Sequence, residues 1–167
     1  MQHEGFPMRA VHCTMALVIL MGAYGCRSSN PVGPGSFGSA SSAIVVLKDP
    51  LTLPFPRDPA TIRAARVSAD TLTLVVLFGG GCKHHDFTLF ARWGFVETFP
   101  CIAVVYLSHD AHGDLCRAMV TDTLAFTLDP LKQEYLDLYR REDTILLEIW
   151  EPSLKKSFSP LPVYDPW

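Results

Sequence analysis

The strongest constraint on the fold is an alternation of apolar and polar residues with a period of two. Between residues 71 and 78 every even position is apolar, and the first two odd positions are threonine. Residues 86–93 and 116–128 repeat the alternation, each with one apolar and one more polar face. A period of two places alternate side chains on opposite faces of a strand, whereas an amphipathic helix has a period of 3.6. The pattern therefore predicts half-buried β-strands.

Turn residues interrupt the apolar runs at intervals of about ten residues, which is typical of an all-β sandwich or barrel. The other expected strands are 44–47, 62–68, 101–109 and 144–150. The run Cys101–Leu107 is apolar throughout, so we expect it in the centre of a sheet. One helix is expected near Asp129, as its N-cap, and Pro130, in its first turn. We predict an all-β, mainly antiparallel β-sandwich of about seven strands with one short helix. Residues 160–167 add a short edge strand or lie across the domain.

Composition and charge limit the classes of partner. Of the 167 residues, 49% are hydrophobic and 19% are charged, which is enough apolar material for a domain with a buried core. The 17 acidic residues and 14 basic residues give a formal net charge of -3. This charge offers no electrostatic footprint for nucleic acid or for an anionic membrane surface. We therefore expect no nucleic-acid partner.

The N-terminal residues have the pattern of an export signal. The apolar run Met15–Met21 is too short to span a bilayer, which needs about 20 apolar residues, and it fits the core of a signal peptide. The charge ahead of this run is poor if translation starts at Met1 and better if it starts at Met8. We expect residues 1–25 to be a signal peptide, with both start sites open.

The signal ends in a motif that resembles the lipobox of bacterial lipoproteins: Ala23-Tyr24-Gly25-Cys26. In that family cleavage precedes a cysteine that becomes diacylated, so the resemblance implies a lipid anchor on Cys26. Ala23 stands where the family usually has leucine, and cleavage by an ordinary signal peptidase after Gly25 stays open. Both routes export the protein. Because Arg27 rather than aspartate follows the cysteine, the resemblance favours an outer-membrane lipoprotein that faces the periplasm or the cell surface.

The segment after Cys26 has the composition of a linker. Residues 28–42 are dominated by Ser, Gly, Pro and Ala, which cannot build a core. Such a segment has an r.m.s. reach of about 20 Å. We therefore expect a lipidated cysteine with a flexible linker at 26–42 and the β-sandwich domain at 43–167.

Strand direction predicts that the chemically active residues gather at one end of the sandwich. If successive strands alternate in direction, loops 79–85 and 110–115 share an end, and Cys101 lies at the opposite end. The shared end collects cysteines, histidines and aspartates: Cys82, His84, His85, Asp86, His109, Asp110, His112, Asp114 and Cys116. In an exported protein the simplest interpretation is a disulfide between Cys82 and Cys116. Cys101 is then a small buried apolar residue.

Two other interpretations of the cysteines stay open. The first is a zinc or copper site, because these ions prefer two thiolates and two imidazoles; its ligands are Cys82, His85, His109 and Cys116. The second is a nucleophilic enzyme, which requires a free thiolate at Cys82 or Cys116 beside a histidine. An oxidising compartment and a second nearby cysteine disfavour the enzyme.

The segment Asp110–Asp114 carries oxygen donors at alternate positions, as calcium loops do. It lacks the glycine at the sixth position and the distal glutamate of an EF-hand loop. A hairpin turn with Gly113 at positive φ explains the segment without an ion. We expect the side chains of these loops to face a ligand, namely His84, Asp110, His112 and Asp114.

A distinctive pattern joins two segments of the chain, Gly79-Gly80-Gly81-Cys82-Lys83-His84-His85-Asp86-Phe87 and His109-Asp110-Ala111-His112-Gly113-Asp114-Leu115-Cys116. It resembles a group of uncharacterised bacterial lipoproteins with Gly-Gly-x-Cys-x-x-His-x-Phe and His-Asp-x-x-Gly-Asp-x-Cys motifs. The resemblance covers roughly residues 71–150. It implies export, pairs the two cysteines as a unit, and gives no substrate.

Together these observations favour a cell-envelope lipoprotein whose disulfide-stapled β-sandwich is a structural or ligand-binding module. Its expected partners are the membrane, through the N-terminal lipid anchor, and an envelope protein or small ligand. No cofactor and no catalytic residue are expected. The alternative is an extracytoplasmic protein that binds zinc or copper through Cys82, His85, His109 and Cys116.

Overall fold

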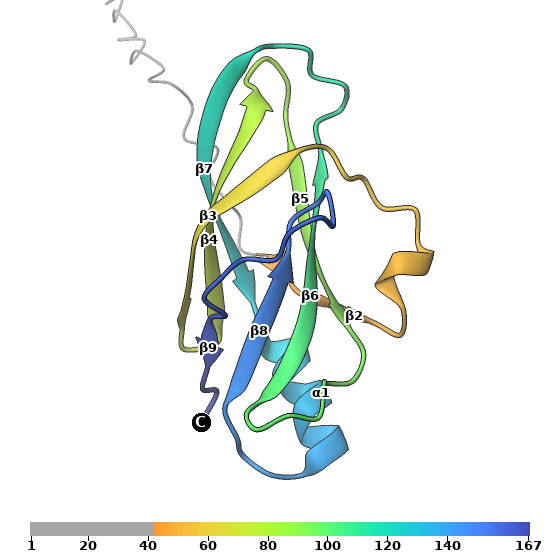
Figure 1. Cartoon of the computed structure of the whole chain (residues 1–167), viewed down its shortest axis with the longest axis vertical. Helices are drawn as coiled ribbons and strands as arrows, with labels where there is room; N and C mark the ends of the chain where they lie inside the picture. The colour runs from red at the N-terminus through yellow and green to blue at the C-terminus, as the bar shows by residue number, and fades with distance from the viewer. Residues whose placement is uncertain (1–41) are drawn as a thin grey trace, which may run out of the picture. The chain divides into compact units, whose positions relative to one another are not determined.

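The computed structural model describes residues 42–167, which form the strands and helices drawn in Figure 1. The strands are β1 (Ser42–Ala43), β2 (Val45–Leu47), β3 (Ala60–Ser68), β4 (Thr71–Gly80), β5 (Asp86–Arg92), β6 (Cys101–Asp110), β7 (Ala118–Thr127), β8 (Ile145–Trp150) and β9 (Val163–Tyr164). The helical segments are a 3-10 turn, η1 (Pro50–Thr52), and the helix α1 (Asp129–Tyr139). The expected signal peptide (1–25), Cys26 and the linker before Ser42 lie outside the described residues.

Two mixed sheets make up the fold, so the prediction of an all-β sandwich with one short helix is confirmed. One sheet has the order β1-β7-β4-β3 and the other the order β2-β5-β6-β8-β9. Four neighbouring pairs are antiparallel, but β1–β7, β2–β5 and β6–β8 are parallel. The chain between β6 and β8 passes through β7 of the other sheet and then through α1, and such a long crossover allows a parallel pair.

Most local predictions hold, and the N-cap of α1 is corrected. β6 is the central strand of its sheet, and β9 adds a short edge strand, as the sequence predicts. α1 begins where expected with Pro130 in its first turn, but Asp129 is not its N-cap. Leu128 occupies the cap position, and the Asp129 carboxylate instead accepts a hydrogen bond from Oγ1 of Thr127 at 2.8 Å.

Within residues 42–167 no helix is long and apolar enough to cross a membrane.

The core lies between the sheets because each inward-facing stripe is apolar. The even positions of β4, from Leu72 to Phe78, are at most 4% exposed. They belong to one buried cluster with the inner faces of β6 and β8 and with two residues of α1, Leu131 and Tyr135. Figure 1 shows α1 at the lower end of the sheets, so this end is closed by an apolar helix face.

The opposite end is closed by two loops that cross between the sheets. β4 and β7 belong to one sheet and β5 and β6 to the other, so the connections 81–85 and 111–117 both cross (Figure 1). The prediction that these loops share an end is confirmed. The predicted hairpin turn within Asp110–Asp114 is wrong, because β6 pairs with β5 and β8 but not with β7. Gly113 does have positive φ, at 63°.

Candidate functional site

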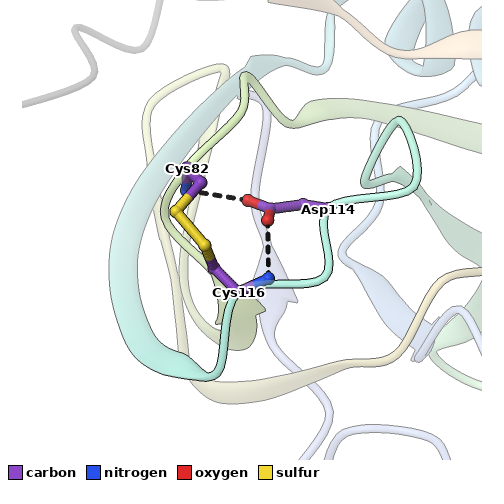
Figure 2. Close-up of side chains that lie close together, drawn as sticks. All are labelled: Cys82, Asp114 and Cys116. Carbon is purple, nitrogen blue, oxygen red and sulfur yellow. Dashed lines mark hydrogen bonds between the residues drawn. A yellow bond between two sulfur atoms is a disulfide. The ribbon is translucent and has the colours of Figure 1, made fainter.

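A disulfide between Cys82 and Cys116 joins the two crossing loops (Figure 2). Their Cα atoms are 6.0 Å apart and they are separated by 34 positions in the sequence. This is the disulfide that the sequence predicts. Cys101, the free cysteine among the described residues, is buried at the far end of β6. Burial raises the pKa of its thiol.

Asp114 ties the two loops together beside the disulfide (Figure 2). Its side chain is only 1% exposed. Oδ2 accepts hydrogen bonds from the backbone N–H groups of Cys82, at 2.8 Å, and Lys83, at 2.9 Å. Oδ1 accepts one from the N–H of Cys116 at 2.9 Å. These bonds, that of Cys116 above all, hold the pKa of Asp114 far below its usual range. The carboxylate is turned into the loops, so the expected ligand-facing role does not fit its burial.

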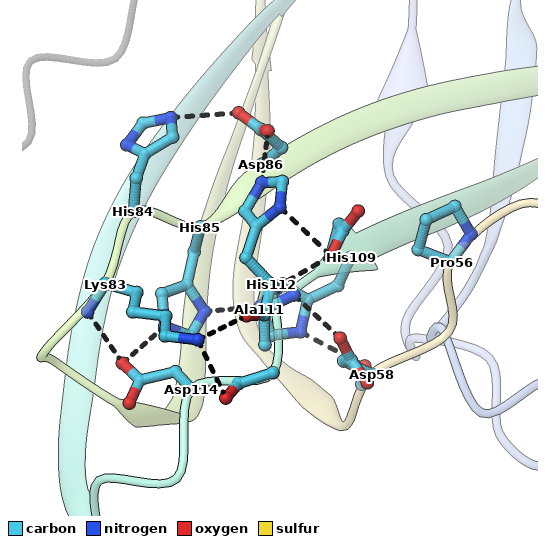
Figure 3. Close-up of polar contacts among 12 residues, drawn as sticks. Pro56, Asp58, Lys83, His84, His85, Asp86, His109, Ala111, His112 and Asp114 are labelled. Carbon is cyan, nitrogen blue, oxygen red and sulfur yellow. Dashed lines mark hydrogen bonds and ion pairs between the residues drawn. The ribbon is translucent and has the colours of Figure 1, made fainter.

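His85 and His109 continue from Asp114 into the sandwich as a pair of buried rings (Figure 3). His85 Nε2 lies 3.3 Å from Asp114 Oδ2, and His85 Nδ1 lies 2.8 Å from His109 Nε2. His109 Nδ1 lies 3.1 Å from the carbonyl oxygen of Asp58. Phe87 stacks on His109 with ring centroids 4.4 Å apart, and burial lowers the pKa of His109.

The partners of this pair fix where its shared protons lie. The Asp58 carbonyl can only accept, so Nδ1 of His109 carries a proton and donates to it. Because burial disfavours a charge on His109, its Nε2 is bare and accepts a hydrogen bond from Nδ1 of His85.

The residues expected to bind zinc or copper lie at this end but are already engaged. The sulfur atoms of Cys82 and Cys116 are bonded to each other, whereas metal binding needs thiolates. Among residues 42–167, the set of ligating side chains whose donor atoms lie within 4.8 Å of one another is Cys82, Asp114 and Cys116. It contains neither His85 nor His109. A metal site built from the expected four residues requires reduction of the disulfide and stays a prediction.

A second polar group lies on the exposed rim of the same loops (Figure 3). His84 Nε2 is 2.9 Å from Asp86 Oδ1, and His112 Nε2 is 2.7 Å from Asp86 Oδ2. His112 Nδ1 is 3.7 Å from Asp110 Oδ1. The hydrogen bond between Asp86 and His112 is the first cause of a lowered pKa at Asp86 and a raised pKa at His112. The structure thus brings His84, Asp110 and His112 together around Asp86, to which the sequence assigns no role.

Other residues that sequence reasoning missed hold these loops in place. The Nζ of Lys83 donates to the carbonyl oxygens of His112, at 2.7 Å, and Gly113, at 3.2 Å. Asp58 Oδ2 accepts a hydrogen bond from the N–H of Ala111 at 2.7 Å. Lys83 lies inside the motif quoted above, between Cys82 and His84, so the motif could have indicated its role. Asp58 lies in a segment without periodicity and reaches its partner across 53 positions of sequence, so nothing local predicts it.

Comparison with known proteins identifies the class of fold. No family model matches the chain, and no curated protein matches it. It is similar to the crystal structure of a toxin-related protein from Parabacteroides distasonis, with a TM-score of 0.52 and 16% identity over 75% of this chain and 62% of that one. It is also similar to a NigD-like immunity protein from Bacteroides caccae, with a TM-score of 0.54 and 18% identity over 77% of this chain and 66% of that one.

These similarities show that the two-sheet β-fold of this chain is shared with those proteins over the matched part. The chain matches less than two thirds of the length of either of these proteins. In this chain a disulfide and a buried carboxylate join the two crossing loops at the polar end.

Proposed function

We propose that this chain is an exported module of a bacterial cell envelope that presents its two crossing loops to an envelope protein or a small ligand. The observation that carries the proposal is the disulfide between Cys82 and Cys116. Disulfides form and persist in oxidising compartments outside the cytoplasm. The signal-like residues 1–25 and the lipobox-like Cys26 support the same location and add a lipid anchor at the outer membrane.

A binding role fits the polar end better than a catalytic one. Both cysteines near the histidines are consumed by the disulfide, so neither supplies a thiolate nucleophile. His85 and His109 bond to each other and to structural acceptors. The fold shared with a NigD-like immunity protein supports binding, and the motif resemblance to uncharacterised bacterial lipoproteins supports the envelope location.

The anchor and the export are tested together in a bacterial host. The full chain is expressed with a clickable palmitate analogue, beside Cys26→Ala and, as a matched control, Cys101→Ala. We expect label in the wild type and the control, no label in Cys26→Ala, and an oxidised pair at 82 and 116 in all three. An unlabelled wild type contradicts the lipid anchor, and a chain found in the cytoplasm with all thiols free contradicts export.

The metal alternative rests on the gathering of its four expected ligands, Cys82, His85, His109 and Cys116, at one end of the sandwich. It predicts that reduction of the disulfide increases zinc or copper binding by the purified chain and that Cys82→Ser prevents the increase. The same metal content before and after reduction contradicts this alternative and leaves the envelope proposal untouched.

A further inference from the structure

The exposed rim of the crossing loops carries a group of ligating side chains that is separate from the buried network. His84 belongs to the first crossing loop, Asp86 begins β5, and His112 belongs to the second crossing loop. The two imidazoles approach the two oxygens of the same carboxylate, at 2.9 and 2.7 Å (Figure 3). Two imidazoles and a carboxylate are donors that zinc and its neighbours among the transition metals prefer.

The register of the sheet that contains β5 and β6 places a second carboxylate beside this group. Asp86 of β5 and Asp110 of β6 are direct cross-strand partners in an antiparallel pair. Side chains at such positions project to the same face, and like charges placed there repel each other. Neither carboxylate has a Lys or Arg among its close ion-pair partners in the described residues; both are faced by His112. A divalent ion beside this pair offsets the repulsion.

We propose that His84, Asp86 and His112 bind a divalent transition-metal ion of the zinc class and that Asp110 positions His112. His112 directs Nε2 to Asp86 and Nδ1 to Asp110, at 3.7 Å. Metal-binding histidines commonly direct their second ring nitrogen to a carboxylate, which fixes the orientation of the ring. Three protein ligands leave a coordination position open for water or an exchangeable ligand.

The scaffold fixes the backbone of His112, and the two imidazole side chains are exposed. His112 has a left-handed backbone with φ 48°, held by Lys83 Nζ on its carbonyl and by Asp110 Oδ1 on its N–H. The side chains of His84 and His112 are 68% and 45% exposed. The donor atoms of the complete set do not all lie within 4.8 Å of one another in this arrangement, so binding requires the two exposed rings to move closer together over Asp86.

Zinc titration of the purified full chain tests the site. With zinc chloride in a buffer that does not chelate, isothermal calorimetry should show saturable binding near one ion per chain. His84→Ala, His112→Ala and Asp86→Asn each remove a ligand and should weaken binding more than about a hundredfold, whereas loss of the orienting carboxylate in Asp110→Asn should weaken it about tenfold. Asp137→Asn, an exposed change on α1, is the matched control and should bind as the wild type does.

The double variant His84→Ala/His112→Ala keeps His85, His109 and the histidines outside the described residues. Zinc binding equal to wild type in this variant or in Asp86→Asn overturns the proposal, as does an absence of saturable binding in the wild type. Cobalt provides a second readout: the wild type and Asp137→Asn should show visible absorption bands of a bound ion, and Asp86→Asn should not. These outcomes do not depend on the lipid anchor or on export.

Discussion

At the scale of single residues, the carboxylate of Asp114 organises both crossing loops. It accepts hydrogen bonds from the backbone N–H groups of Cys82, Lys83 and Cys116, and it contacts His85. Burial of a charge is stable only when such bonds replace its hydration. The disulfide joins the same two loops covalently, so Asp114 and the disulfide act on one structural unit.

The lowered pKa of Asp114 makes this contribution dependent on pH. Its folded pKa lies below the ordinary value of 3.8, so the stabilisation is complete above about pH 4 and is lost as the pH falls through the folded pKa. We expect Asp114→Asn to lower the urea midpoint of unfolding at neutral pH. The difference between wild type and variant should shrink as the pH falls below about 4. A difference that stays constant from neutral pH to about pH 2 contradicts the assignment.

The tautomers of the histidine pair are directly measurable. The network requires a proton on Nδ1 of His109, a bare Nε2 on the same ring, and a proton on Nδ1 of His85. Two-bond proton–nitrogen NMR spectra of the purified chain near neutral pH distinguish these forms. A proton on Nε2 of His109, or a bare Nδ1 on His85, would contradict the network.

At the scale of elements, the end of β4 is built for close approach. Gly80 has φ 145°, and a Cβ atom there would lie 2.5 Å from His85 Nε2. Gly79, one position earlier, has no positive φ, and a Cβ atom there would meet nothing within 4 Å. The two neighbouring glycines therefore differ in what they tolerate, although the sequence presents them as equivalent.

This difference gives a matched pair of variants. Gly80→Ala should destabilise the fold by about 1–3 kcal/mol, because it both strains the backbone and displaces His85. Gly79→Ala should change the free energy of unfolding by no more than about 0.5 kcal/mol, as an exposed substitution without a steric conflict. Urea denaturation of both variants and the wild type measures the effect. Equal effects of the two substitutions would show that His85 does not restrict this position.

The elements also show how far the sequence could go. The period of two predicts the strands well because each strand has one buried and one outer face, and it places β6 in the centre because both its faces are apolar. The parallel pairing of β6 with β8 depends on the path of the chain through β7 and α1, which no local pattern encodes. The alternation of strand direction predicted the shared end and supported the disulfide. The hydrogen bonds of Asp58 with Ala111 and of Asp86 with His112 join segments that are distant in the sequence, so no local pattern predicts them.

At the scale of the whole sandwich, the two ends are closed by different chemistry. The helix α1 closes one end with Leu131 and Tyr135, which are buried in the common core. The other end is closed by polar loops whose order depends on a disulfide, one carboxylate and two buried rings. We therefore expect reduction of the disulfide to affect the polar end more than it affects the core.

Removal of the disulfide should destabilise the polar end more than the α1 end. In the chain-entropy model, opening a loop of 34 positions costs roughly 4 kcal/mol of stability, so Cys82→Ser/Cys116→Ser should unfold at a lower urea concentration than wild type. Hydrogen exchange should rise most in 81–85 and 111–117 and least in the central strand β6, because local opening needs little apolar exposure at the loops and much in the core. Cys101→Ser is the control, since it leaves the loops intact and perturbs only the α1 end. A uniform rise in exchange across both ends would mean that the disulfide stabilises the sandwich as one unit, with no separately ordered polar end for a ligand to engage.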